Sequence, residues 1–285
     1  MIFDRKGFTL IELLVVMSII GVLAAALVVS MPKVSQRARD MKCKANLKNI
    51  AQATLTYSVQ KESFPHAHPG EYKRPGKLNG RFGVIYQETK AWVNWTGNGV
   101  WANFSSQRGM MTMPQLSGDL AYDALTNGVL WSFIGKDAST YCCPAFKKAA
   151  KRQGVTDLWR SYVMNYRFHW HGEGQGFHWH KDFTWNGDGI QRSAATVLMY
   201  AELPMDEIDT SEEGGDGKLD PDNDDEYIGF NHQVGKRNIS HVAYADGHVG
   251  VLLEPSSGSQ SDLIDLTSQL CNGEEIDISL LWDMH

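Results

Sequence analysis

The feature that most restricts this 285-residue chain is an unbroken apolar segment near its N-terminus. Residues 8–31 contain one charged side chain, Glu12, close to the start of the segment. A helix of this length, at about 1.5 Å per residue, crosses roughly 30 Å of hydrocarbon. Arg5 and Lys6 precede it as positive, cytoplasmic flanks. A secretory signal peptide has a shorter apolar core. The sequence therefore predicts a membrane anchor, with the rest of the chain outside the cytoplasm.

Glu12 indicates more than an anchor, because a carboxylate in hydrocarbon costs roughly 2.5–3.5 kcal/mol at a helix centre and less near its end. The string Gly7-Phe8-Thr9-Leu10-Ile11-Glu12-Leu13 resembles the prepilin processing site of type IV pilins and type II secretion pseudopilins. The resemblance implies that prepilin peptidase cuts between Gly7 and Phe8 and methylates Phe8. It also implies that Glu12 pairs with the terminal amine of a neighbouring subunit during assembly.

Hydrophobic periodicity predicts that the helix continues beyond the membrane. Residues at three- and four-residue steps share one helical face, and here they are Leu47, Ile50, Ala51, Thr54 and Tyr57. The pattern ends near Phe64-Pro65, and Pro32 is expected to kink the helix. We expect a leader peptide over residues 1–7, a transmembrane or filament-core helix over 8–31, its amphipathic continuation over 32–64 and a globular head over 65–285.

The head is predicted to be rich in β-structure. Short β-favouring runs are separated by glycine and asparagine clusters, and they cover residues 82–86, 91–95, 161–168, 196–201 and 241–253. The expected fold class is therefore α+β, with a long N-terminal helix packed on an antiparallel β-sheet head, as in pilins.

An Asp-Gly pair predicts a C-terminal hairpin with a two-residue loop, Asp246-Gly247. Asp246 is interpreted as a turn former rather than an active-site carboxylate. Pairing outward from this loop places four apolar side chains on one face, expected to be the core face: Val242, Tyr244, Val249 and Val251. His241 and His248 then lie on the other face, too far apart to share a metal.

Several head segments resemble a family of large prepilin-like proteins with a His…Asp-Gly C-terminal region. The matching segments are Tyr141-Cys142-Cys143-Pro144, residues 161–166, Gly229-Phe230-Asn231-His232 and residues 245–249. Thirteen residues separate His232 from Asp246 here, whereas nine are usual in that family, which indicates a longer connecting loop. The resemblance implies no catalytic role for the head.

A near-palindromic segment over residues 169–180 is a candidate site for a transition metal. Folded as a hairpin, it would bring four imidazoles to one face, from His169, His171, His178 and His180. Such clusters suit zinc, copper or nickel. The alternative is a solvent-facing hairpin whose tryptophans fill the core.

An acidic segment over residues 216–226 is a candidate calcium site. Carboxylates that could wrap one ion come from Asp216, Asp220, Asp222 and Asp224. The segment is not an EF-hand, since Asp225 stands where the sharp-turn glycine belongs. A solvated acidic loop is the alternative.

The four cysteines are too few for a disulfide scaffold. Outside the cytoplasm one bridge is expected, from Cys271 to either Cys142 or Cys143. Residues 202–226 contain twelve acids and one lysine, which argues against nucleic acid as a partner. The chain also lacks a nucleophile elbow, a phosphate-binding loop and a dinucleotide fingerprint, so we do not expect an enzyme.

Two functions are consistent with the sequence. The first is a structural subunit of a type IV pilus-like or type II secretion pseudopilus filament, held in the bacterial inner membrane and then assembled with like or related subunits into a periplasmic or cell-surface filament. The second is a membrane-anchored envelope protein that binds glycan or metal and uses the prepilin helix for sorting. The sequence does not separate pilus from pseudopilus, or major from minor subunit.

Overall fold

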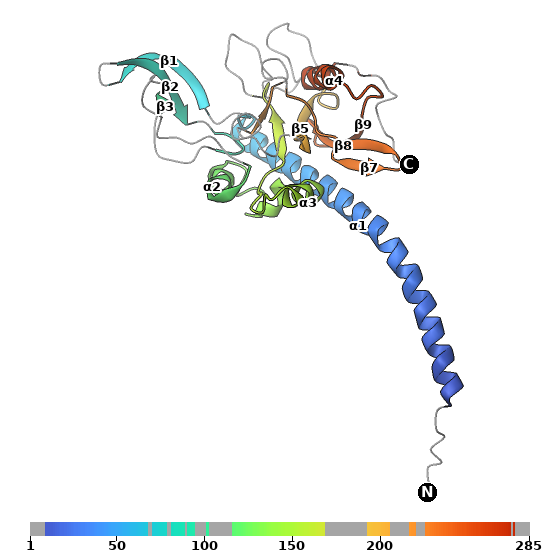
Figure 1. Cartoon of the computed structure of the whole chain (residues 1–285). Helices are drawn as coiled ribbons and strands as arrows, with labels where there is room; N and C mark the ends of the chain where they lie inside the picture. Colours follow the sequence, from blue (N-terminus) through green and yellow to red (C-terminus); the bar gives the residue numbers. More distant parts are fainter. Residues whose placement is uncertain are drawn as a thin grey trace.

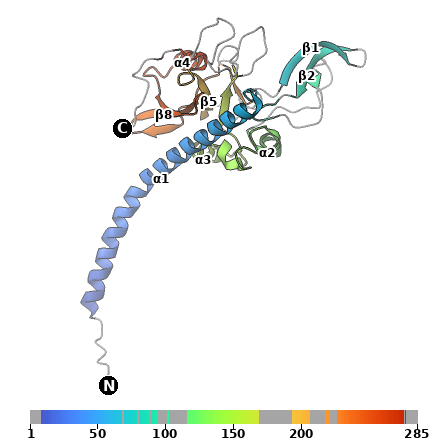
Figure 2. The same ribbon diagram turned by 180° about the vertical axis from the view of Figure 1, so that it is seen from behind.

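One long helix, α1 (Leu10–Lys61), carries the head along its C-terminal half (Figure 1). The structure is a computed structural model that describes residues 9–67, 70–78, 81–88, 90–94, 101–102, 116–168, 193–205, 217–220, 226–274 and 276. Viewed from either side, α1 extends well beyond the head toward the N-terminus (Figure 2).

The N-terminal part of α1 is apolar and exposed. Residues Leu10–Val28 have a mean hydropathy of 2.7 and none of this span is buried, so the helix is long and apolar enough to cross a membrane. The helix continues through Pro32. Its ribbon curves gradually along its length (Figures 1 and 2).

The C-terminal half of α1 packs into the head along the face that the periodicity predicted. The five predicted residues are all buried: Leu47, Ile50, Ala51, Thr54 and Tyr57. Cys43 lies one turn before Leu47 on the same stripe and is also buried. The helix ends at Lys61, and its C-cap residue Glu62, three residues before Pro65, has a left-handed φ of 53°. This stripe joins the stem of the molecule to its head.

The main sheet of the head has six strands. Their order is β6 (Lys218–Leu219), β4 (Tyr162–Asn165), β5 (Leu198–Glu202), β8 (Arg237–Tyr244) and β7 (His232–Val234), with β9 (Val249–Leu253) also paired to β8. All pairs are antiparallel except β4 with β6. The α+β class is therefore confirmed, and the sheet is mixed rather than wholly antiparallel.

Strands β5 and β7 lie end to end along one edge of β8. Ile239 pairs with His232 of β7 and with Leu253 of β9, so β7 and β9 lie on opposite edges of β8. Ala243 pairs with Tyr200 of β5 and also with β9. The end of β5 and the start of β7 therefore meet on the edge opposite β9.

The other elements of the head are a second sheet and several helices. A second sheet contains β1 (Gly70–Leu78), β2 (Arg81–Glu88) and β3 (Trp101–Ala102). The helices are α2 (Gly118–Asn127), the 3-10 helix η1 (Ala138–Tyr141), α3 (Pro144–Arg152) and α4 (Gln260–Asn272). Residues 91–94 do not form the predicted strand, because Ala91 makes only an isolated bridge with His66.

Trp92 lies at the centre of the core. Its side chain is fully buried, and its indole Nε1 donates to the Gly217 carbonyl at 3.0 Å. The ring centroid lies 5.9 Å from that of Tyr141, in a stacked arrangement, and 5.1 Å from that of Tyr200, edge to face. One aromatic side chain thus packs η1 against strand β5.

The hairpin of β8 and β9 has a loop one residue longer than predicted. Residues 245–247 connect the strands, and Gly247 has a φ of 84°, which glycine adopts readily. In this register His241 pairs with Val251, so the two side chains share a face. The prediction that Val251 shares a face with Val242 was therefore wrong. The pairing of β9 with β8 is shifted by one residue, which moves every side chain of β9 to the other face. His241 is 1% exposed.

Asp246 forms the turn of this hairpin, as predicted. Its Oδ1 accepts the His248 backbone N–H at 2.9 Å and lies 2.6 Å from His248 Nδ1, and both side chains are largely exposed. Lys48 of α1 donates to the Gly247 carbonyl at 2.7 Å. The turn is thereby tied to the long helix.

Candidate functional site

The prepilin-like N-terminus is described from Thr9 onward, so Gly7 and Phe8 lie outside the described residues. Glu12 is exposed on the first turn of α1 and forms a capping box with Thr9. Its carboxylate accepts the Thr9 backbone N–H and the Thr9 hydroxyl, each at 2.8 Å. Within a single chain, Glu12 is therefore already hydrogen-bonded to the start of its own helix.

Most residues of the two predicted metal sites also lie outside the described parts of the chain. They are Asp216, Asp222, Asp224, His169, His171, His178 and His180. Asp220 is described and is 2% exposed. Its backbone N–H donates to Glu226 at 2.6 Å, and Lys218 Nζ lies 3.5 Å from its carboxylate. Binding of calcium or a transition metal at these residues stays a prediction.

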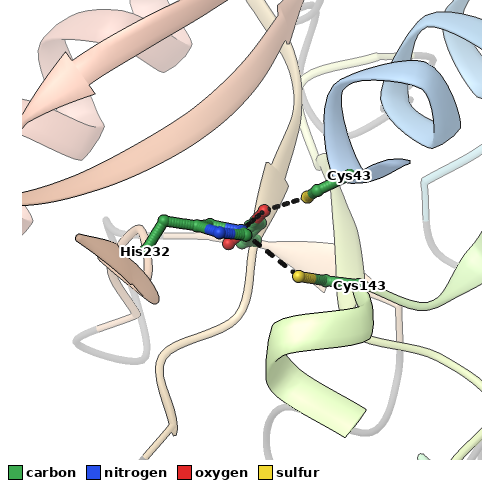
Figure 3. Close-up of side chains that lie close together, drawn as sticks. Cys43, Cys143 and His232 are labelled. Carbon is green, nitrogen blue, oxygen red and sulfur yellow. Dashed lines mark hydrogen bonds and ion pairs between the residues drawn. The ribbon is translucent and has the colours of Figure 1, made fainter. Parts of the chain in front are cut away.

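Four other potential metal ligands meet inside the head (Figure 3). Cys43 lies on α1, Cys143 immediately precedes α3, Glu202 ends β5 and His232 begins β7. One ligand atom from each lies within 4.8 Å of all the others, and all four residues are buried. We call these four residues the ligand cluster.

The atoms of the ligand cluster are in direct contact. Cys143 Sγ lies 3.3 Å from His232 Nε2, and the same nitrogen lies 3.0 Å from Glu202 Oε1. The Cys43 thiol donates to Glu202 Oε1. Tyr162 adds its hydroxyl 3.1 Å from Cys43 Sγ. Two sulfurs, an imidazole nitrogen and a carboxylate oxygen thus face a common centre.

The sheet topology explains why Glu202 and His232 meet. Glu202 is the last residue of β5 and His232 the first of β7, and these two ends meet along the edge of β8 near His241 of that strand. The His232 and His241 ring centroids are 4.4 Å apart, and His241 Nδ1 lies 3.7 Å from Glu202 Oε1. Cys43 and Cys143 approach this junction from the helices packed beside it.

Each member of the ligand cluster is also held from outside, Cys43 by the Tyr162 hydroxyl. His232 Nδ1 lies 2.6 Å from Asp40 Oδ1, one turn before Cys43 on α1. Glu202 Oε2 accepts from the Asn231 side-chain amide at 3.2 Å. The Cys143 backbone N–H donates to Ser161 Oγ at 2.6 Å. These contacts leave His232 Nε2 and Glu202 Oε1 directed at the cluster.

The electrostatics reflect the burial of this group. Burial opposes charge on His232, but the Glu202 carboxylate and the contacts with Asp40 and Cys143 raise the pKa of His232 to about 12. Burial would raise the pKa of Glu202, yet His232 and His241 hold it well below its ordinary value. Burial, Cys143 and Glu202 raise the pKa of Cys43. Burial disfavours the Cys143 thiolate, but hydrogen bonds from Cys43 and His232 lower its pKa. The imidazolium of His232 therefore balances the charge of the Glu202 carboxylate, and the buried thiols offer a substrate no exposed nucleophile.

The predicted disulfide from Cys271 to Cys142 or Cys143 is wrong, because all four cysteines are free. The Cys143 thiol is turned toward Cys43 and His232. Cys142 Sγ lies 3.7 Å from the Cys143 carbonyl. Cys271 belongs to α4, which lies across the head from α3 (Figures 1 and 2).

Two family models match this chain. The model described as "Prokaryotic N-terminal methylation motif" matches residues 2–28. The model described as "Protein of unknown function (DUF1559)" matches residues 33–195, more than half of the chain. The chain belongs to the DUF1559 family. Together with the apolar α1, the two matches confirm that this DUF1559 protein is prepilin-like.

A similarity to a pilin agrees with this result. Over 60 residues the DUF1559 protein is 37% identical to the type IV major pilin protein PilA of Myxococcus xanthus (strain DK1622). The match covers 21% of this chain and 27% of the relative, so the chain spans about a quarter of the pilin. No solved structure matches the chain. The His…Asp-Gly resemblance of the C-terminal region stays a prediction.

Two short-range signals in the sequence point to parts of the ligand cluster. Cys43 extends the apolar stripe of α1 by one turn, and His232 ends one of the segments that carry the family resemblance. Neither signal pairs the two residues. Glu202 carries no local signal at all.

Proposed function

We propose that this DUF1559 protein is a structural subunit of a type IV pilus-like or type II secretion pseudopilus filament. Its precursor is cleaved by prepilin peptidase between Gly7 and Phe8, and the new N-terminus is methylated. The match of residues 2–28 to the methylation motif supports this processing. The protein acts by assembly with other pilin-like subunits rather than by catalysis.

The observation that carries this proposal is the contrast between the two halves of α1. The C-terminal half is covered by the head, whereas the described residues bury none of the apolar span Leu10–Val28. Lipid covers this span in the bacterial inner membrane, with the head outside the cytoplasm. In a periplasmic or surface filament, the same helices of neighbouring subunits replace the lipid.

Glu12 is assigned to assembly in this proposal. In the single chain its carboxylate is satisfied by Thr9, which lowers the cost of holding it near the membrane. The terminal amine of a neighbouring mature subunit offers a full positive charge in place of those neutral donors. When that amine replaces Thr9 as the partner of the Glu12 carboxylate, the stronger charged interaction favours docking of one subunit beside another.

Filament assembly is tested by shearing the cell surface and examining the released material by electron microscopy and N-terminal mass spectrometry. We expect filaments whose subunits begin at methylated Phe8. Glu12→Ala should leave processed protein in the membrane and no filaments. Ser18→Ala, which only removes a bond to the Val15 carbonyl in the same helix, should assemble normally. A full-length precursor confined to membranes, or normal assembly of Glu12→Ala, would favour an anchored envelope protein instead.

Calcium binding by Asp216, Asp220, Asp222 and Asp224 is a separate proposal that rests on their spacing alone. Calcium should raise the melting temperature of the detergent-solubilised protein above its value in EDTA. Replacing Asp222 and Asp224 by Asn should abolish that rise.

A further inference from the structure

The ligand cluster has the composition of a zinc site. We propose that Cys43, Cys143, Glu202 and His232 bind one Zn²⁺ ion inside the head. Zinc sites in proteins combine thiolates, imidazoles and carboxylates in a tetrahedron, and softer sulfur ligands favour zinc over calcium or magnesium. The proposal does not depend on filament assembly, because every ligand belongs to one chain.

The spacing of the four atoms fits a tetrahedron around zinc. Bonds of roughly 2.3 Å to sulfur and 2.0–2.1 Å to nitrogen or oxygen place the ligand atoms about 3.3–3.8 Å from one another. The distances of 3.3 Å from Cys143 Sγ to His232 Nε2 and 3.0 Å from His232 Nε2 to Glu202 Oε1 are close to these values. All four ligand atoms fall within 4.8 Å of one another. Seating the ion also requires Cys43 Sγ and Glu202 Oε1, which are in direct hydrogen-bond contact, to move apart.

The outer contacts orient the ligands as they do around zinc in other proteins. A histidine ligand commonly donates its second ring N–H to a carboxylate, which fixes the tautomer. Asp40, 2.6 Å from His232 Nδ1, is placed to accept that N–H, which directs Nε2 at the cluster, where loss of its proton would free a lone pair for the ion. The Asn231 side-chain amide donates to Glu202 Oε2, which leaves Oε1 for the ion.

The site is closed, so its role is structural. Structural zinc sites have four protein ligands, whereas catalytic ones keep a position for water or substrate. Here all four ligands are buried and come from α1, the start of α3, the end of β5 and the start of β7. On binding, the thiols of Cys43 and Cys143 and the Nε2 nitrogen of His232 lose their protons to solvent, and the two thiolates, the freed nitrogen and the Glu202 carboxylate bond the ion. Zinc would thereby fasten the long helix to the sheet.

The direct test uses the full-length protein in detergent, purified with a thiol reductant and without chelators, then incubated with excess zinc and desalted. Elemental analysis should find about one zinc per chain, and X-ray absorption should find two sulfur and two nitrogen or oxygen neighbours at roughly 2.3 and 2.0–2.1 Å. Failure to retain zinc, a first shell without sulfur, or iron or copper bound in its place would overturn the assignment. So would a Cys43–Cys143 disulfide in protein isolated from the envelope.

Variants locate the ion. Cys43→Ser and Cys143→Ser should lose zinc, while Cys142→Ser and Cys271→Ser, which change buried cysteines outside the cluster, should retain it. Replacing His169, His171, His178 and His180 together by Asn should also leave zinc in place. If that replacement removes zinc, or if Cys43→Ser and Cys143→Ser keep it, the assignment is wrong.

A milder variant guards against misfolding of the cysteine variants. Asp40→Asn keeps the size of the side chain but weakens the acceptor for His232, and loss of such a contact lowers metal affinity by roughly 10–100-fold. Asp246→Asn is the matched control, because Asp246 lies at the same 2.6 Å from a histidine Nδ1, on the exposed turn. Equal zinc affinity in the two variants, measured by competition with a chromogenic chelator, would contradict the proposal.

Discussion

Asp40 on α1 and His232 on β7 are 192 positions apart in the sequence, yet their Oδ1 and Nδ1 atoms lie 2.6 Å apart. The same stretch of α1 makes a second polar link to β7, where Gln36 donates to the Gln233 carbonyl at 2.7 Å. The side-chain bond from Lys48 to the hairpin turn is a third link. The long helix and the C-terminal strands therefore form one structural unit.

The buried stripe of α1 should contribute strongly to the stability of this unit. Leu47 is fully buried, and Leu47→Ala should lower the free energy of unfolding by about 2–5 kcal/mol, because it leaves a cavity between helix and sheet. Val59 is 66% exposed on the same helix, and Val59→Ala should change the free energy of unfolding by less than about 0.5 kcal/mol. Chemical denaturation of the detergent-solubilised protein measures both. Similar losses would mean that the head does not pack on this face.

Trp92 should be the most sensitive single position of the core. Trp92→Ala removes the packing with Tyr141 and Tyr200 and leaves the Gly217 carbonyl without its indole donor, so we expect a loss of about 3–5 kcal/mol. Trp92→Phe should cost less, because it keeps an aromatic ring. Thermal unfolding followed by near-UV circular dichroism gives the comparison, and an unchanged melting temperature for Trp92→Ala would contradict it.

Asn165 is a polar side chain that should be needed inside the sheet. It donates to the Leu198 carbonyl at 2.8 Å and to the Cys271 carbonyl at 3.0 Å, which links β4 to β5 and α4. Asn165→Ala should cost about 1–3 kcal/mol for each buried carbonyl left unpaired. Asn238→Ala, at an exposed asparagine bonded to Glu254, is the matched control and should be nearly neutral. Equal stability of the two variants would show that these buried bonds contribute little.

The buried tyrosines predict a loss of stability in alkali. Burial raises the pKa of Tyr244 to about 12, and it raises the pKa of Tyr141 and Tyr200 as well. An unfolded phenol titrates near pH 10. The stabilisation is therefore fully present below about pH 10 and decreases as the pH rises toward the folded values.

This prediction is checked by following phenolate absorbance and near-UV circular dichroism together from about pH 9 to pH 12. Part of the phenolate signal should appear only as the tertiary signal is lost, whereas urea-unfolded protein should titrate near pH 10. Complete titration near pH 10 with the tertiary signal intact would contradict it.

Local patterns predicted much of this fold. The three- and four-residue steps from Leu47 to Tyr57 identified the buried face of α1, since helical geometry fixes which residues share a side. The apolar run that follows Phe8 identified the exposed half. Runs such as residues 196–201 identified strands. The register of the last hairpin was missed, because Asp-Gly also suits a three-residue loop in which only glycine is left-handed.

The ligand cluster could not be predicted in the same way. Its members come from four elements separated by tens of residues, so no spacing rule relates Cys43 to Cys143 or Glu202 to His232. Their meeting depends on β5 and β7 sharing one edge of β8, which is a property of sheet topology. The error in the predicted register of the last hairpin also hid the place of His241, because it assigned His241 to the face away from Val251. In the structure His241 lies beside Glu202 and His232.

The links between α1 and the last strands also determine when the chain can fold. The helix is synthesised first, but β7, β8 and β9, which contact or flank its buried stripe, follow more than 170 residues after its end. Contacts between such distant segments form slowly, because a long loop must close before they are made. A chain cut short before β7 would therefore be inserted but unfinished, with part of its helix stripe uncovered, and envelope proteases and chaperones should be able to tell such truncated chains from complete ones.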